Sequence, residues 1–526
     1  MPVSLKAANS KMARLRTLWP FIILLLAWEI AGRMDWVASG ALPSISEILV
    51  RFFIDRADYP RHISATLQAS AAGFVIGNII AVLAGLLFAF SPAANRVARG
   101  LNITLFALPP IVIAPILALT LEGMTPRIVL AALGVYFVTM QATMTGLAQF
   151  DSRAADVVRA YGGGRWAVLR LIQLRGALPA ILSGFRVAAP NAVLGAILAE
   201  FGGGGRWGLG VYLLGSLGRG EPARLWGIGL VATLIAGLAY AVFAMLSSRL
   251  LGQSRGVSLN PSAAITHQKK RFSVLFAAGS LLLPFALWWG FLVLLKVPPM
   301  LGRTLLDVMQ YLFFDPQAAK TQALIISALA ETLPITAIGM ATGLAFAFAL
   351  AVSAQIAPGF TRVFLPVALV TQTMPLVALT PLLVLMLGRG TAVTLWITIS
   401  VTFFPAYVMI TQGLAEVPRA ALELPRAYGA SRMRQLQLIS IPASMPWLFA
   451  AIRTTVPRAL LGVMIAEWLA TGRGLGNLLN QSRGYMDFNM IWTVAVISVM
   501  LSVAFHQIVL AIELYVIRYG NTKSST

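Results

Sequence analysis

Apolar runs of about twenty residues recur along the whole chain, and no other feature limits its fold as strongly. A helix needs ~20 apolar residues to cross the ~30 Å hydrocarbon core of a bilayer, and we count about twelve such runs. Charged residues make up 11% of the chain and hydrophobic residues 58%, whereas soluble proteins carry about 25% charged residues. Strand patterns are absent, so we expect every span to be helical, in an all-α membrane protein.

We predict these spans as two sets of six. They fall near residues 18–38, 64–90, 101–121, 127–149, 177–200 and 225–248, and then near 272–296, 324–355, 361–387, 391–413, 445–470 and 489–517. The first run follows several basic residues and resembles the start of a signal peptide. Because a second copy of this segment lies at 272–297, deep inside the chain, we expect the first copy to be a permanent helix.

The two halves of the chain repeat one another at an offset of 267 residues. The matched residues are Tyr161 with Tyr428, Gly162 with Gly429, Arg186 with Arg453, Pro190 with Pro457, and Glu200 with Glu467. With a slip of one residue, Pro109 falls on Pro375, Pro115 on Pro381, and residues 208–210 on 474–476. Such self-similarity indicates a tandem duplication. We therefore predict a first repeat at 1–250, a linker at 251–271 and a second repeat at 272–526; six spans per repeat make the repeats parallel.

The basic residues predict how the chain is oriented. A net charge of +22 is also found in nucleic-acid-binding proteins, but here Lys and Arg are spread over short loops and not gathered on one soluble domain. They collect near both termini, in the linker, and in the segments 151–175 and 416–442. The positive-inside rule places these segments, and both termini, in the cytoplasm.

One polar interruption occurs twice. Residues 156–175 read DVVRAYGGGRWAVLRLIQLR, and residues 423–442 read ELPRAYGASRMRQLQLISIP. After each glycine the apolar residues recur every three positions, which is typical of a short amphipathic helix. The glycine allows the chain to bend, or another backbone to approach closely. An interfacial helix whose arginines bind lipid phosphates is one interpretation; the repetition favours a partner with two equivalent sockets.

These stretches resemble the EAA loop of binding-protein-dependent ABC importer permeases, in which Glu-Ala-Ala precedes a conserved Gly and then Ile-x-Leu-Pro. The matching residues are Glu423, Gly429, Ile439 and Ile441-Pro442 in the second half, and Asp156, Gly162, Ile172 and Leu174 in the first. The departures are Leu424-Pro425 and Val157-Val158 in place of the alanines, Asp156 in place of Glu, and Arg175 where Pro442 stands. The whole chain is most similar to the nitrate, sulfonate, taurine and bicarbonate branch.

This resemblance implies a type I ABC importer permease fold in a bacterial inner membrane, with both halves surrounding a path for a small solute. It implies two copies of a cytoplasmic ATPase that bind ATP and Mg²⁺, an external solute-binding protein, and an anionic solute such as a sulfonate, nitrate or bicarbonate. It assigns coupling to the ATPase to Asp156, Tyr161, Gly162, Glu423, Tyr428, Gly429 and Pro442. The chain has no phosphate-binding G-x-x-x-x-G-K-[ST] sequence, so we expect a transport subunit without enzymatic activity or a cofactor of its own.

Other residues are candidates for the path and its gate. Prolines occur at matched places in the third span of each half, where they form ordinary kinks or shape a path: Pro109, Pro115, Pro375 and Pro381. Arg458, with Asn191 at the same place in the first half, lies within a span, where an ionisable residue indicates function. Attraction of an anionic solute is one role for it. Glu200 and Glu467 end the fifth spans, as an outer gate or as structural contacts.

Several other functions are disfavoured by the sequence. His62, His267 and His506 show no metal-ligand spacing, and no paired carboxylates suggest hydrolytic chemistry. The chain has no cysteine. A membrane-embedded transferase lacks the clustered His, Asp or Glu that it requires. An ion-coupled secondary transporter with internal repeats remains the alternative, although it does not need a repeated cytoplasmic motif.

Overall fold

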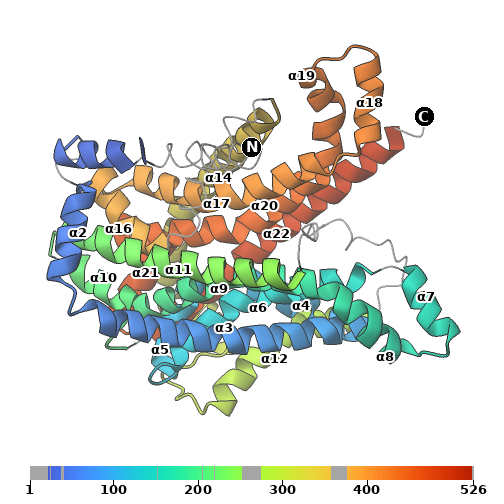
Figure 1. Ribbon diagram of the computed structural model, residues 1–526. Helices are drawn as coiled ribbons and strands as arrows, with labels where there is room; N and C mark the ends of the chain where they lie inside the picture. The colour runs from blue at the N-terminus through green and yellow to red at the C-terminus, as the bar shows by residue number, and fades with distance from the viewer. Residues whose placement is uncertain are drawn as a thin grey trace.

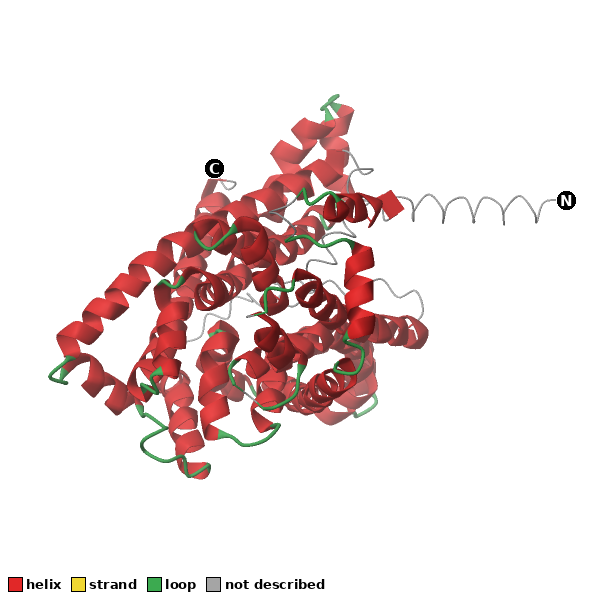
Figure 2. Ribbon diagram, turned by 90° about the vertical axis from the view of Figure 1, so that its left-hand side faces the viewer, coloured by secondary structure: helices red, strands yellow, loops and turns green. Residues whose placement is uncertain are grey.

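The computed structural model describes residues 22–23, 25–36, 41–150, 152–203, 205–217, 219–251, 274–356 and 376–523. These residues form helices joined by turns and loops, without a strand among them (Figure 2), which confirms the predicted fold class. Among the described residues, eight helices are long and apolar enough to cross a membrane: Tyr59–Phe90, Thr125–Ala148, Arg165–Phe201, Pro222–Leu250, Ala318–Ile356, Thr391–Ala415, Arg432–Thr471 and Phe488–Val516. Each corresponds to a span predicted from the sequence.

The span expected at 101–121 is wrong as a single helix. It consists of α4 (Pro92–Ala107) and α5 (Pro110–Thr120), which are bent by 96° at the break between them. Two consecutive prolines cause the bend, because proline disfavours the helical conformation of the residue before it. Leu108 and Pro109 are accordingly extended, with ψ of 116° and 117°. Of the span expected at 361–387, the structure describes only α16 (Leu376–Leu387).

Two further predictions meet the described residues only in part. The second copy of the opening segment, expected at 272–296, is helix α12 (Val274–Leu294). The first copy, expected at 18–38, is helical at 22–23 and 25–33 and forms a turn at 34–36. The predicted linker at 251–271 lies outside the described residues beyond Leu251.

The two halves begin alike. Short helices α2 (Ile45–Ile54) and α13 (Leu305–Phe313) each begin with a capping box, in which a hydroxyl and a carboxylate satisfy the first backbone N–H groups. A tryptophan pair then joins the first and last helix of each half. Trp28 packs on Trp226 with ring centroids 5.0 Å apart, and Trp288 packs on Trp492 at 5.3 Å. The duplication seen in the sequence is therefore repeated in contacts.

Three long helices form the body of each half (Figure 1). In the first half these are α3 (Tyr59–Phe90), α6 (Thr125–Ala148) and α9 (Leu174–Phe201); in the second they are α14 (Ala318–Ile356), α17 (Thr391–Ala415) and α20 (Ile441–Ala466). Glycines let them approach closely: a Cβ on Gly73 would lie 2.5 Å from that of Ala131, and one on Gly339 would lie 2.7 Å from that of Thr398. Small residues at helix crossings are typical of membrane proteins.

One helix of the second half joins the two halves by packing on the first half. Helix α12 belongs to the second half but packs on α4 of the first. The backbone N–H of Gly100 donates a hydrogen bond of 2.7 Å to the hydroxyl of Ser280, and Arg96 lies 4.3 Å above the ring of Phe276. Helix α22 (Phe488–Lys523) also packs on α4 and α5. The repeats therefore form one body and not two separate domains.

Candidate functional site: two coupling hairpins and a central gap

Both interrupted stretches form helical hairpins at the same end of the molecule (Figure 1). The first consists of α7 (Ser152–Ala160) and α8 (Arg165–Val168), and the second of α18 (Arg419–Ala427) and α19 (Arg432–Gln435). The sequence predicts a short amphipathic helix after each glycine, but this helix does not stand alone. It runs through a π-helical turn, Leu169–Gln173 or Leu436–Ser440, directly into a membrane span. Each hairpin is thus continuous with a helix long enough to cross a membrane.

The repeated glycine terminates the first helix of each hairpin. Gly162 and Gly429 have φ of +83° and +73°, the left-handed conformation that favours glycine. The N–H of Gly162 donates to the carbonyl of Arg159, and the N–H of Gly429 donates to that of Arg426, both at 2.9 Å. The N–H of the following residue donates to the carbonyl of Val158 in the first hairpin and of Pro425 in the second, also at 2.9 Å. This is a Schellman cap. A Cβ at either glycine would meet nothing within 4 Å in this chain, so the fold uses the glycine to bend the chain and not for a close contact.

The hairpins carry large side chains that the chain itself leaves uncovered. Tyr161 is 90% exposed, Tyr428 84%, Trp166 75% and Leu424 65%. Asp156, Glu423 and Pro442 are all exposed. Asp156 also forms an ion pair with Arg159 at 2.8 Å. Of the predicted apolar row, Leu169 and Leu436 are buried against the bundle, while Trp166 and Met433 face outward. The two hairpins thus present aromatic rings next to arginines.

Four helices from the two halves meet at the centre. Helix α5 packs on both α9 and α20, and α16 also packs on both. Pro109 and Pro115 are buried at the start and in the middle of α5. Pro381 lies in α16, and Pro375 lies outside the described residues. Asn191 on α9 and Arg458 on α20 are both partly accessible. We call the region where α5 and α16 each pack on both α9 and α20 the central gap.

Each gate glutamate is buried in a set of hydrogen bonds. Glu200 is 1% exposed and accepts bonds from the hydroxyl of Thr66 at 2.8 Å and from the N–H of Gly210 at 2.7 Å. The same hydroxyl accepts a bond of 2.9 Å from the N–H of Leu209. The carboxylate therefore ties the beginning of α3 and the start of α10 (Leu209–Leu217) to the end of α9. We call this set the first glutamate clasp.

The second half repeats this arrangement. Glu467 is 2% exposed and accepts bonds from Thr332 at 2.7 Å and from the N–H of Gly476 at 2.8 Å. The N–H of Leu475 donates to Thr332 at 2.9 Å. Gly474, with φ of +87°, has no room for a Cβ because the carboxylate occupies that place. This second glutamate clasp joins α14, α20 and α21 (Gly474–Gly484), so both glutamates form structural contacts of the kind that the sequence left open.

Two arginines that sequence analysis did not single out lie beside the first clasp. Arg127 of α6 is 4.0 Å from Glu200 and occupies the place of a Cβ on Gly205. Arg483 of α21 crosses from the second half: it donates to the carbonyl of Phe201 at 3.4 Å, and a Cβ on Gly203 would lie 2.8 Å from it. Burial lowers the pKa of the Arg483 guanidinium. Gly203 and Gly205 thus accommodate the two guanidinium groups, whereas Gly202 lies against Ala114 of α5.

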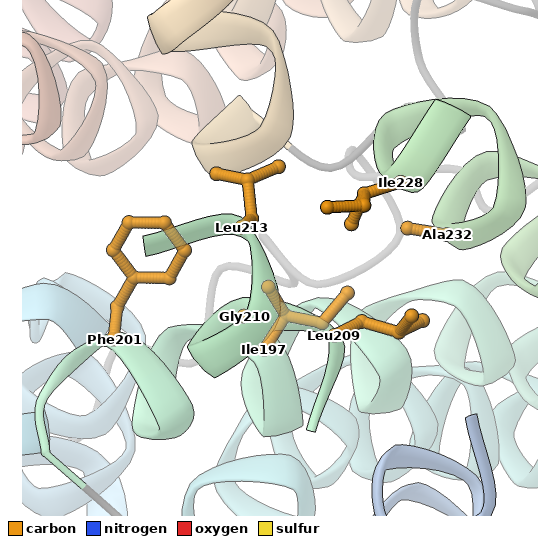
Figure 3. Close-up of a pocket in the computed structure, with 7 residues that line it drawn as sticks. All are labelled: Ile197, Phe201, Leu209, Gly210, Leu213, Ile228 and Ala232. Atoms are coloured by element: carbon orange, nitrogen blue, oxygen red, sulfur yellow. The ribbon is translucent and has the colours of Figure 1, made fainter. Parts of the chain in front are cut away.

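Next to the first glutamate clasp, α10 packs against apolar side chains of α9 and α11 (Pro222–Leu251). Figure 3 shows the narrow gap between α10, α9 and α11, lined by Ile197, Phe201, Leu209, Gly210, Leu213, Ile228 and Ala232. No lining side chain carries a hydrogen-bonding group, so the gap is a packing contact that holds the clasp in place. It is not a site for a polar solute.

Known proteins resemble the chain in both halves. The sequence profile of the family described as "Binding-protein-dependent transport system inner membrane component" matches residues 77–254 and again 341–517. A "Probable ABC transporter permease protein" of Haemophilus influenzae is 28% identical over 219 residues, 41% of this chain and 89% of that relative. That relative is therefore about half as long as this chain.

Other relatives match over shorter stretches. The "Riboflavin transport system permease protein RibX" of Chloroflexus aurantiacus is 32% identical over 127 residues, 24% of this chain and 47% of that protein. The "Putative aliphatic sulfonates transport permease protein SsuC" of Escherichia coli is 23% identical over 120 residues, 23% of this chain and 46% of that protein. The chain thus spans about half the length of these two relatives.

Proposed function

The chain belongs to the family of binding-protein-dependent transport system inner membrane components, and from this premise we propose that it forms the whole membrane path of an ATP-driven importer. Two family segments lie in one chain: one begins within α3 and extends past the end of α11, and the other begins within α14 and ends within α22. Relatives such as the Haemophilus protein are about half as long. One copy of this chain therefore supplies both halves, and the membrane part needs no second permease chain.

The hairpins are the docking sites for two copies of a separate ATPase. They project from one end of the bundle, they carry exposed aromatic rings, and each continues without a break into α9 or α20. Exposed tyrosine and tryptophan are typical anchors of protein interfaces. ATP-driven closure of the ATPase pair moves the hairpins, and the attached helices carry that motion to the central gap. This single observation, a matched pair of rigid hairpins, supports the coupling role most strongly.

The solute passes between the halves through the central gap. Helices α5 and α16 border it together with α9 and α20. The two glutamate clasps lie at the other end of α9 and α20 from the hairpins, so they fix the outer loops against which an external binding protein docks. The chain lies in a bacterial inner membrane with both termini and both hairpins in the cytoplasm, as its basic residues indicate.

Reconstitution tests this function. The purified chain alone should neither hydrolyse nor bind ATP, because the sequence has no phosphate-binding loop. With its ATPase and binding protein in proteoliposomes, hydrolysis should rise when loaded binding protein is added, and labelled solute should accumulate. Uptake driven by a proton or sodium gradient without ATP would contradict the importer and support the secondary transporter, which family membership disfavours.

A further inference from the structure

Two short helices have one face that the described part of the chain leaves uncovered. Helix α2 buries Ile48 against the bundle, and α13 buries Val308. Along the other side of each helix the large apolar side chains are exposed: Leu49, Val50, Phe53 and Ile54 on α2, and Leu306, Met309 and Phe313 on α13, followed by Phe314. Single exposed apolar residues are common on proteins, whereas a row of them on one face indicates a surface that binds something.

Helix α2 lies across the end of the bundle opposite the hairpins, at a steep angle to α3, which follows it in the chain (Figure 1). Ion pairs fix its polar side to the start of α11. Arg224 donates two hydrogen bonds of 2.7 Å to Asp55, and Arg51 lies 2.8 Å from Glu221. These contacts turn Phe53 and its apolar neighbours away from the protein. A helix that is held crosswise to the spans, with its apolar face outward, has the form of an interfacial helix.

Helix α13 is fixed at the same end of the molecule by different contacts. The hydroxyl of Tyr311 donates a hydrogen bond of 3.3 Å to Asp487, just before α22, whereas α2 has Arg51 at the matched position. When the two capping boxes are aligned, the apolar pairs that remain are Leu49 with Met309, Phe53 with Phe313, and Ile54 with Phe314. Val50 and Leu306 have polar counterparts. A water-facing surface would have been free to become polar after the duplication, so the retained apolar pairs indicate a face that avoids water.

Exposed apolar side chains continue from α2 into the helices that precede and follow it. The N–H and the hydroxyl of Ser46 donate to Glu29 of the opening helix at 3.0 and 2.7 Å, which places the start of α2 beside that helix. Trp36, in the turn that ends the opening helix, is exposed, and tryptophan is enriched where a bilayer meets water. After α2, the span α3 exposes Leu67 and Val75. The face of α2 thus lies between segments whose exposed surfaces the bilayer covers.

We propose that α2 and α13 are interfacial helices, whose exposed faces lie among the acyl chains of the leaflet at the end opposite the hairpins. A soluble partner such as a binding protein would form a mixed interface, since such interfaces are only slightly more than half non-polar. The exposed row on α2 has no charged or hydrogen-bonding side chain, which suits acyl chains. The two helices therefore hold the starts of α3 and α14 at the depth of the headgroups. This role goes beyond the transport function, because it involves neither the ATPase nor the solute.

Fluorescence quenching of the full chain in lipid vesicles tests this arrangement. The native chain has no cysteine, so Phe53→Cys and Phe313→Cys each place a single thiol on an exposed face, where an environment-sensitive nitrobenzoxadiazole label can be attached. The vesicles consist of phosphatidylcholine, with or without a fraction of lipid that carries a nitroxide on its acyl chain. The apolar face of an interfacial helix lies about 5–10 Å into the boundary, so the nitroxide should quench both labels at least about twofold, and aqueous iodide should quench them little.

Two further positions supply the controls. Met500→Cys puts the label on the exposed side of the span in α22, where the nitroxide should quench strongly, and Tyr485→Cys puts it directly after α21, where iodide should dominate. Iodide quenching at Phe53→Cys and Phe313→Cys equal to that at Tyr485→Cys would overturn the proposal. Labels that neither quencher reaches would also overturn it, as would labels that iodide reaches until the binding protein is added, which would assign the face to that protein. The measurement uses the chain alone, so its failure leaves the importer function standing.

Discussion

The hydroxyl of Thr332 donates a hydrogen bond of 2.7 Å to the carboxylate of Glu467 and so ties the beginning of α14 to the end of α20. Thr66 forms the same bond with Glu200 in the first half. Each carboxylate also accepts a backbone N–H from the following loop. One buried group therefore fixes three segments, and the retention of the whole set in both repeats argues for a structural role in holding the outer loops.

Replacing Glu467 by Gln should destabilise the protein. Gln places an NH₂ donor against one of the two groups that donate to Glu467, which leaves a buried donor unsatisfied at a cost of ~1–3 kcal/mol. A thermal unfolding curve in detergent measures the change. The control is Glu331→Gln, since Glu331 is 45% exposed and lies 3.9 Å from Arg473, where a pair contributes about 0–1 kcal/mol. Equal losses in the two variants would show that the clasp does not depend on the carboxylate.

Replacing Gly429 by Val should weaken coupling while the protein still inserts. The left-handed conformation costs a residue with a Cβ ~1–2 kcal/mol, about a five- to thirtyfold change in a local equilibrium. Gly429→Asn should be milder, because Asn tolerates this conformation. Stimulation of ATPase activity by loaded binding protein measures the effect. If removal of Arg432 and Arg434 impairs transport while Gly429→Val has no effect, the hairpin anchors lipid and does not couple.

Replacing Tyr428 by Ala should release the ATPase without loss of stability. The ring is 84% exposed, so its removal leaves no cavity in this chain, whereas an aromatic anchor at an interface typically contributes ~2 kcal/mol or more. Co-purification of the ATPase should fall, and the melting temperature should stay unchanged. Tyr161→Ala tests the first hairpin in the same way. Tyr485→Ala is the control, since that ring is 85% exposed directly after α21, at the end of the molecule that carries the second clasp. A comparable loss there would refute specific docking.

Replacing Gly100 by Val should loosen the junction between the halves. A Cβ at Gly100 would overlap the backbone of Ser280 on α12, and overpacking typically costs ~1–3 kcal/mol. Gly290→Ala on α12 is the matched control, because nothing lies within 4 Å of a Cβ there and alanine favours a helix. Thermal unfolding compares the two. A junction variant as stable as the control would mean that α12 does not depend on this contact.

Topology is expected to follow the basic residues. Cysteine introduced at Gln268, in the predicted linker, and at Tyr161 should react with a membrane-impermeant reagent only after the cell is opened. Cysteine at Tyr485, which is exposed directly after α21 at the end opposite the hairpins, should react in intact cells. Labelling of Gln268→Cys from outside intact cells would contradict the orientation.

Periodicity and repetition predicted much of this fold, because a bilayer leaves helices few alternatives. A kink at Pro109 was among the predictions, but the break of the span into two helices bent by 96° was not, since length and hydropathy say nothing about where a span breaks. The continuity of the hairpins into α9 and α20 was missed because polar residues interrupt the apolar pattern without ending the helix.

The clasps show a different limit of the sequence. Glu200 and Glu467 stood out as charged residues at the ends of spans, but their partners Thr66 and Thr332 are far away in the chain and have no distinctive neighbours. Arg483 was missed for the same reason, since only the folded chain places it at the glycine run of the other half. Contacts between distant segments of ordinary composition leave no local pattern.

Arg458 and Asn191 occupy matched positions in the two repeats, and this difference has a consequence for how such a protein can evolve. A dimer of identical chains carries every side chain twice, so its central gap holds two arginines, which repel one another, or none. Once both copies are encoded in one gene, a single base change alters one wall of the gap and spares the other. Fusion thus releases the molecule from symmetry and permits an odd number of charges along its axis.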